Sequence, residues 1–205
     1  ETKLRMMQAQ LNPHFLYNTL DTVKWLGVAH HAPQVAELAT NLAAVLRSAI
    51  SGDEIITLDR ELDLIERYLA IQSIRFEDRF TCEIDVPERF RSCLVPKLAL
   101  QPLVENAILH GVADLEEGYI KLTAQEEEGD LLLTVSDNGP GIPQDILEAV
   151  NSPEKRPPGG HLGLFNVDSI IRLHYGPRYG LSVLPGEGSR VRLRLPIRRE
   201  EALPC

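Results

Sequence analysis

Hydrophobic residues recur at helical spacing in the first part of the chain. On a helical wheel, the apolar positions of residues 2–29 form two stripes on opposite sides, one with Leu11, Phe15 and Leu26 and one with Leu16, Leu20 and Val23. A helix that is apolar on two sides usually lies inside a bundle or at a dimer interface. We therefore expect this helix to form the centre of a homodimer.

Two more helices are expected before residue 76. Residues 33–50 keep the three-and-four spacing of apolar positions until Ser51 and Gly52 stop it. A third helix follows Thr57, which is a suitable N-cap, and continues to about Arg75. The first 75 residues are thus predicted to be all-helical, with the second helix folded back on the first.

The hydrophobic period changes to two at Phe80. Apolar and polar residues alternate from there until Pro87, as in a strand. The same patterns predict a helix at 96–110, strands at 119–126 and 131–137, a short helix after Pro143, a helix at 163–174, and strands at 180–184 and 189–195. Residues 151–161 lack apolar periodicity and predict a loop.

This arrangement defines the expected fold class, which is α+β. A helical dimerisation domain at residues 1–75 precedes an α/β sandwich at residues 76–200, and residues 201–205 form a tail. The helices of the second domain should cover a sheet that is built from antiparallel hairpins.

Composition and charge exclude several classes of function. The 205 residues are 43% hydrophobic and carry a net charge of −9, so broad attraction to nucleic acid is disfavoured. The three cysteines have no metal-ligand spacing, and a reducing cytoplasm fits them best.

No stretch is apolar enough to cross a membrane, but the chain opens directly in a predicted helix. We therefore expect a fragment whose missing N-terminal region could include a sensor or a membrane anchor.

One candidate binding segment follows the strand at 131–137. Asp137 ends that strand, and Gly139 and Gly141 follow it. Such a turn lets the backbone approach a ligand closely, while the carboxylate accepts a hydrogen bond from an amino group. The alternative is an ordinary Asn-Gly turn.

A second glycine cluster leads into the helix at 163–174. It contains Gly160, Leu162, Gly163 and Leu164. Free backbone N–H groups and the helix dipole at such a start favour a phosphate group. A plain linker is the alternative, and the loop at 151–161 lies where a lid over a nucleotide would be.

The third candidate segment is the predicted helix that ends at His110. It carries Glu105, Asn106 and His110 among apolar residues, and Asn106 and His110 share one face because they are four residues apart. An amide oxygen with a nearby histidine could hold Mg²⁺ and phosphate. Taken alone, His110 is better explained as a residue that stabilises the C-terminal end of its own helix.

The three segments together resemble the N, G1 and G2 boxes of the Bergerat ATP-binding fold, which gyrase, MutL and histidine kinases share. The resemblance implies that Asn106 binds Mg²⁺ with ATP and that Asp137 accepts a hydrogen bond from the adenine amino group. It further implies that Gly139 and Gly141 shape the floor under the adenine ring. Gly160 and Gly163 would flank the phosphates.

Residues 10–20 are similar to the phosphoacceptor box of LytS/YesM-type sensor histidine kinases. In that family the histidine after Asn-Pro, here His14, receives phosphate from ATP and passes it to an aspartate of a response regulator receiver domain. Asn18 shares a flank with His14 on the wheel, and the family pattern assigns it a role in dephosphorylating the regulator. The resemblance implies the cytoplasmic portion of a bacterial cell-membrane protein.

Three positions depart from better-known patterns. Pro102 stands where ATP-hydrolysing relatives have a glutamate, which argues against an ATP-driven machine. Phe15 replaces the acidic residue that often follows the phosphoacceptor, so Glu105 is the candidate base. Leu109 stands where the common kinase pattern has a lysine. Phosphate contacts are therefore expected from His110 and from the lid, with Lys155 or Arg156. A nucleotide-binding module without phosphoryl transfer is the other alternative.

Overall fold

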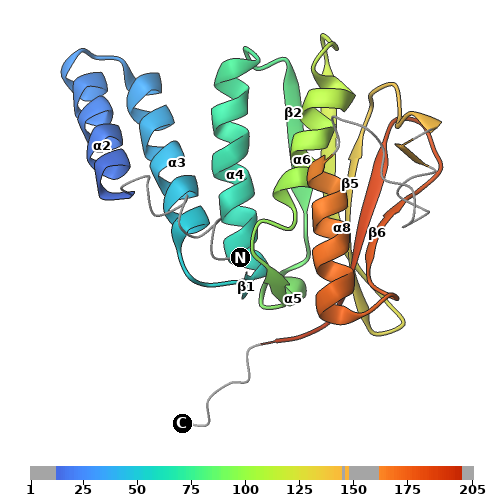
Figure 1. Cartoon of the computed structure of the whole chain (residues 1–205). Helices are drawn as coiled ribbons and strands as arrows, with labels where there is room; N and C mark the ends of the chain where they lie inside the picture. Colours follow the sequence, from blue (N-terminus) through green and yellow to red (C-terminus); the bar gives the residue numbers. More distant parts are fainter. Residues whose placement is uncertain (1–12, 145, 148–161, 200–205) are drawn as a thin grey trace.

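A helical hairpin forms the N-terminal part of the computed structural model, which describes residues 13–144, 146–147 and 162–199. Helix α2 (Pro13–Ala29) folds back on α3 (Pro33–Ile50), as predicted (Figure 1). Gly27 permits the close approach of the two helices, because a Cβ atom there would lie only 2.8 Å from the backbone nitrogen of Ala36. The hairpin therefore depends on a position without a side chain.

A short strand interrupts the predicted run of helices. β1 (Ile55–Thr57) pairs antiparallel with β3 (Leu94–Pro96). α4 (Leu58–Arg75) follows, and the Thr57 hydroxyl caps it by accepting a hydrogen bond from the Arg60 amide at 3.4 Å. The N-cap prediction is confirmed. The prediction that the first 75 residues are all-helical is wrong at β1, because the partner strand lies far along the chain and leaves no local signal.

Among the described residues the main sheet has five strands in the order β2-β4-β5-β7-β6, and of their pairs only β2–β4 is parallel. The strands are β2 (Phe80–Asp85), β4 (Gly118–Glu127), β5 (Asp130–Asp137), β6 (Gly180–Val183) and β7 (Arg190–Pro196). Both predicted hairpins form, and the β4–β5 turn uses Gly129 at φ +79°, a conformation that glycine adopts without strain. Helices α4, α6 and α8 lie together against one face of the sheet (Figure 1).

The helices on that face carry two of the three candidate segments. α6 (Gln101–Asn106) continues directly into a π-helix, η1 (Ala107–Val112), and α8 (Leu162–Tyr175) packs beside them. A single turn, α5 (Glu88–Arg91), precedes β3. The helix predicted to begin near Pro96 begins at Gln101 instead, because Pro96 ends β3 and Leu98 adopts a left-handed φ of +60°.

The hydrophobic core runs across the predicted domain division at residue 75. Leu58, Leu62 and Ile65 of α4 belong to the same buried cluster as Leu103 of α6 and Leu133 of β5. The division at residue 75 stays a prediction, but the packing places α4 with the sheet rather than with the hairpin alone. The predicted tail at 201–205 lies outside the described residues.

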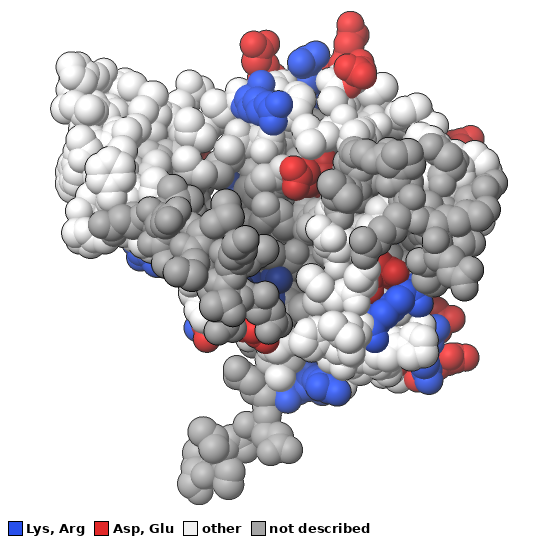
Figure 2. Space-filling model, viewed as in Figure 1, with Lys and Arg blue, Asp and Glu red and all other residues white. Residues whose placement is uncertain are grey.

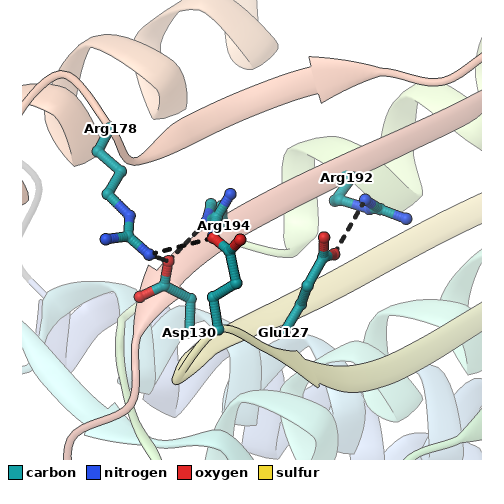
Figure 3. Close-up of polar contacts among 6 residues, drawn as sticks. Glu127, Asp130, Arg178, Arg192 and Arg194 are labelled. Carbon is teal, nitrogen blue, oxygen red and sulfur yellow. Dashed lines mark hydrogen bonds and ion pairs between the residues drawn. The ribbon is translucent and has the colours of Figure 1, made fainter.

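Charged side chains link β7 to the ends of β4 and β5 that meet at their turn (Figure 3). Asp130 is buried and accepts hydrogen bonds from Arg194 Nε at 2.6 Å and from Arg178 Nη2 at 2.7 Å. Glu127 pairs with Arg192 at 3.8 Å beside them (Figure 3). Burial raises the pKa of Asp130, but the two arginines outweigh it and hold the pKa below its ordinary value.

None of the helices in the described part of the chain is both long and apolar enough to span a bilayer.

Candidate functional site

Asn106 lies at the junction of α6 and η1 and is 7% exposed. The segment changes there from α-helical to π-helical hydrogen bonding, a rare geometry that occurs often at functional sites. His110 lies on η1 with its side chain exposed, and Glu105 is exposed on α6. The segment thus presents polar groups beside residues that are mostly buried.

Two adjoining cavities open at this segment, and Asn106 and His110 line both of them. The first has a volume of about 120 Å³ and is completed by Pro102, Glu105, Leu109, Gly163 and Leu164. The second has a volume of about 140 Å³ and is completed by Pro140, Gly141, Ile142, Pro143 and Ser189. Residues from the three candidate segments therefore meet around Asn106 and His110, as the sequence predicts.

Asp137 ends β5 beside this segment and is 7% exposed. Its Oδ1 atom accepts hydrogen bonds from the backbone N–H groups of Gly139 at 3.0 Å and Ser189 at 3.2 Å. Burial raises the pKa of Asp137, and these hydrogen bonds only partly oppose the rise. The side chain is therefore held in a fixed orientation by the backbone on both sides.

Glycines make the close packing around Asp137 possible. A Cβ atom on Gly111 would lie 2.5 Å from the Asp137 carboxyl carbon, and one on Gly139 would overlap the Gly111 backbone. Gly141 has φ +90°, which an L-residue rarely adopts. The turn after β5 and the end of η1 thus form a floor built from backbone atoms.

The start of α8 lines the first of these cavities. Gly163 and Leu164 line the first cavity, and Leu164 is 2% exposed. Leu162 belongs to α8, but its side chain lies outside the described part, as do Gly160, Lys155 and Arg156 with the predicted lid. The N-terminal end of a helix favours negatively charged groups, so this end of α8 suits a phosphate.

His14 lies near the start of α2 with an exposed side chain. The Asn18 side-chain amide is 3.3 Å from its Nδ1 atom, which confirms that the two residues share one flank of the helix. The linings of the two cavities at Asn106 include no residue of α2 among the described residues. A larger cavity of about 790 Å³ separates Leu16 of α2 from Ile170 and His174 of α8.

Sequence reasoning missed Ser189 at the site. Its backbone amide reaches Asp137 because β7 pairs with β5, and Gly188 adopts φ +69° in close contact with the Asp137 backbone. Gly186, Glu187 and Gly188, which precede Ser189, indicate a hairpin turn only. Its role at the site follows from strand order, which local patterns do not specify.

The described fold and site define a two-part protein in which a helical hairpin with an exposed histidine joins an α/β sandwich. Residues 2–80 match the family model described as histidine kinase, and residues 95–199 match the model described as histidine kinase-, DNA gyrase B-, and HSP90-like ATPase. The chain belongs to the histidine kinase family, and residues 95–199 form its ATPase-type domain.

Among curated relatives, the sensor histidine kinase YesM of Bacillus subtilis is 37% identical over 98% of this chain. The sensor histidine kinase BtsS of Escherichia coli is 33% identical over 98% of this chain. The chain spans about a third of the length of these two relatives, 34% in each case.

A solved structure shares the fold. The histidine kinase domain of a blue-light activated kinase from Erythrobacter litoralis superposes with a TM-score of 0.53 at 19% identity, covering 90% of this chain and 94% of that one. The predicted fold class, α+β with a sandwich of Bergerat type, is confirmed.

Proposed function

We propose that this chain is the catalytic core of a two-component sensor histidine kinase. In this proposal it binds ATP with Mg²⁺, transfers the γ-phosphoryl group to His14, and passes that group to an aspartate of a response regulator receiver domain. The observation that carries the proposal is the convergence of Asn106, His110 and Gly163 on one cavity, with Asp137 beside it. A solvent-facing histidine on a neighbouring helical hairpin provides the acceptor.

Each side chain at the cavities has a proposed role in holding the nucleotide. Asn106 would hold Mg²⁺ through its amide oxygen, and Mg²⁺ when bound would neutralise charge on the triphosphate. Asp137 would accept a hydrogen bond from the adenine amino group above the backbone of Gly139 and Gly141. The remaining proposed phosphate contacts are His110 and the G2 residues Gly160, Leu162, Gly163 and Leu164.

The geometry at His14 supports Nε2 as the phosphate acceptor. The Asn18 amide nitrogen lies 3.3 Å from Nδ1, so it holds that ring nitrogen and orients the ring. In the proposed step, Nε2 bonds to the γ-phosphorus, the bond from phosphorus to the β,γ-bridging oxygen breaks, ADP leaves, and the imidazole proton passes to a base. Glu105 is the proposed base because it lines the cavity next to Asn106. For Asn18 we further propose a part in dephosphorylating the regulator.

Exposed apolar side chains on the hairpin support a homodimer. Phe15 is 65% exposed, Trp25 64% and Leu26 53%, and few charged side chains lie over α2 and α3 on the face shown in Figure 2. Two such hairpins would bury these side chains against each other in a four-helix bundle.

We also propose that the core lies on the cytoplasmic side of a bacterial membrane and is joined there by an N-terminal sensor region.

Pro102 favours kinase activity over ATP hydrolysis. It lines the first cavity at the position where the resemblance places the water-activating glutamate of hydrolysing relatives. A proline side chain has no group that can take a proton from water. A steady release of phosphate is therefore not expected from this site.

Incubation with γ-labelled ATP and Mg²⁺ tests the proposal. The parent chain should take up acid-labile, base-stable label, and His14→Gln and Asn106→Ala should abolish it. His30→Gln is the matched control, because His30 is an exposed histidine outside the proposed site and should keep full labelling. Label that persists in His14→Gln would contradict the assignment of the acceptor. Nucleotide binding without label in the parent chain would favour a module that only binds ATP.

A further inference from the structure

Glu61 is a glutamate in the first turn of α4 whose side chain is completely buried, with 0% exposure. Its Oε2 atom accepts a hydrogen bond from the Leu98 amide at 2.8 Å, and its Oε1 atom accepts one from the Leu100 amide at 2.9 Å. Both donors belong to the turn between β3 and α6. A buried carboxylate is stable only where such donors satisfy it, so Glu61 and this turn depend on each other.

The turn that Glu61 holds has an unusual backbone. Leu98 has φ +60°, a left-handed conformation that a residue with a large side chain rarely adopts. Such a conformation persists only when the surrounding structure imposes it. The hydrogen bond from Leu98 to Glu61 is such a constraint, and it sets the direction in which the chain enters α6 at Gln101.

The other end of the same segment is also fixed. Gly111 of η1 packs so tightly against the Asp137 carboxylate that a Cβ atom would lie within 2.8 Å of all three of its carboxyl atoms. Asn106 lies between these two anchors, at the end of α6. Loss of the first anchor would let Asn106 move, while Gly111 and Asp137 keep their contact.

We propose that Glu61 is a positioning residue of the nucleotide site, which holds Asn106 in place for Mg²⁺ by fixing the turn before α6. This inference rests on the proposed function, because it presumes that Asn106 contacts Mg²⁺ and ATP. Glu61 touches neither group. It acts through two backbone amides and the short helix that follows them.

Glu61→Gln tests the proposal, because the amide keeps the size of the side chain but can no longer accept at both oxygens. The dissociation constant of ADP is measured by calorimetry on the full chain, once with Mg²⁺ and once with EDTA. We expect the substitution to raise the dissociation constant of ADP about tenfold with Mg²⁺. In EDTA the dissociation constant should stay within about twofold of that of the parent chain. The unchanged dissociation constant in EDTA is expected because Asp137, which recognises adenine in the proposal, keeps its place.

Asp130→Asn is the matched control, since Asp130 is also a buried carboxylate but lies at the opposite end of β5 from Asp137. It should leave both dissociation constants within about twofold. Where Glu61→Gln gives too little folded protein, Glu61→Asp replaces it, because the shorter side chain cannot span both amides. Equal weakening with Mg²⁺ and with EDTA, or no weakening, would overturn the proposal. A parent chain that binds no ADP would instead refute the proposed function, and with it this inference.

Discussion

Lys97 donates a hydrogen bond from Nζ to the carbonyl oxygen of Ser51 at 2.6 Å, and so joins the turn before α6 to the end of α3. The same Nζ atom donates to the Ser48 carbonyl oxygen at 2.8 Å. The last carbonyl groups of a helix have no partner within it, and a cation interacts favourably with them. Lys97 therefore connects the hairpin that carries His14 to the segment that carries Asn106.

Lys97→Met should lower the free energy of unfolding by about 1–3 kcal/mol, because it removes the charged donor of two hydrogen bonds that join the turn before α6 to the end of α3. Urea denaturation followed by circular dichroism measures the change. Lys121→Met is the matched control, since Lys121 of β4 pairs with Glu83 of the edge strand β2 at 2.7 Å in an exposed contact and should contribute less. Equal effects of the two substitutions would show that the Lys97 contacts do not stabilise the fold.

Gly139→Ala should abolish nucleotide binding and lower the free energy of unfolding by about 1–3 kcal/mol. A Cβ atom at Gly139 would overlap the backbone of Gly111, so the floor beside Asp137 has to shift. Gly52→Ala is the control, because no atom lies within 4 Å of a Cβ atom there. Calorimetry with ADP and urea denaturation measure the two effects. Binding by the Gly139→Ala variant that matches the parent chain would contradict the close packing.

Local patterns predicted much of this fold because local chemistry determines it. Thr57 has a hydroxyl that caps α4, and Gly129 supplies the positive φ of the β4–β5 turn. The order of the three glycine and asparagine segments indicated a common site, and the structure places Asn106, His110 and Gly163 around one cavity. These features each depend on a few neighbouring residues.

The features that the sequence did not reveal depend on distant partners. β1 forms because β3 is the strand with which it pairs. The Ser189 amide reaches Asp137 because β5 pairs with β7. Glu61 has the spacing of an ordinary helix residue, but the turn at Leu98 folds over it and buries it. The π-helical bonding of η1 leaves no signature in the residue types. Each of these needs the tertiary arrangement to be known first.

Asp130→Asn should destabilise the protein by about 1–3 kcal/mol at neutral pH, because it removes the buried carboxylate that Arg194 and Arg178 share and leaves them only the exposed Glu128. The pKa of Asp130 is lowered in the folded state, so its contribution is present above the unfolded pKa of about 3.9 and is lost as the pH falls through the folded pKa. The difference between variant and parent should therefore shrink below about pH 4. Urea midpoints measured from neutral pH to pH 3 check this. A constant difference would contradict it.

Trp25→Glu should convert the proposed homodimer to monomers. Trp25 is 64% exposed on α2, and a charge there cannot be buried against a second hairpin without a large desolvation cost. Gln125→Glu introduces the same charge at an exposed position of β4, outside the hairpin, and is the control for charge alone. Sedimentation at tens of micromolar, together with circular dichroism to verify folding, measures the outcome. A parent chain that sediments as a monomer would count against the dimer.

Asp137→Asn should make the protein more stable and less able to bind nucleotide. Burial raises the pKa of Asp137, so its ionised form destabilises the fold above the folded pKa, and this cost disappears as the pH falls toward the unfolded pKa. Asparagine removes the charge and keeps an oxygen for the Gly139 and Ser189 amides. At neutral pH we expect a gain of about 0.5–2 kcal/mol in unfolding free energy, with at least about tenfold weaker ADP binding. The gain should shrink as the pH falls through the folded pKa and vanish near the unfolded pKa. A variant less stable than the parent at neutral pH would show that the charge itself supports the fold.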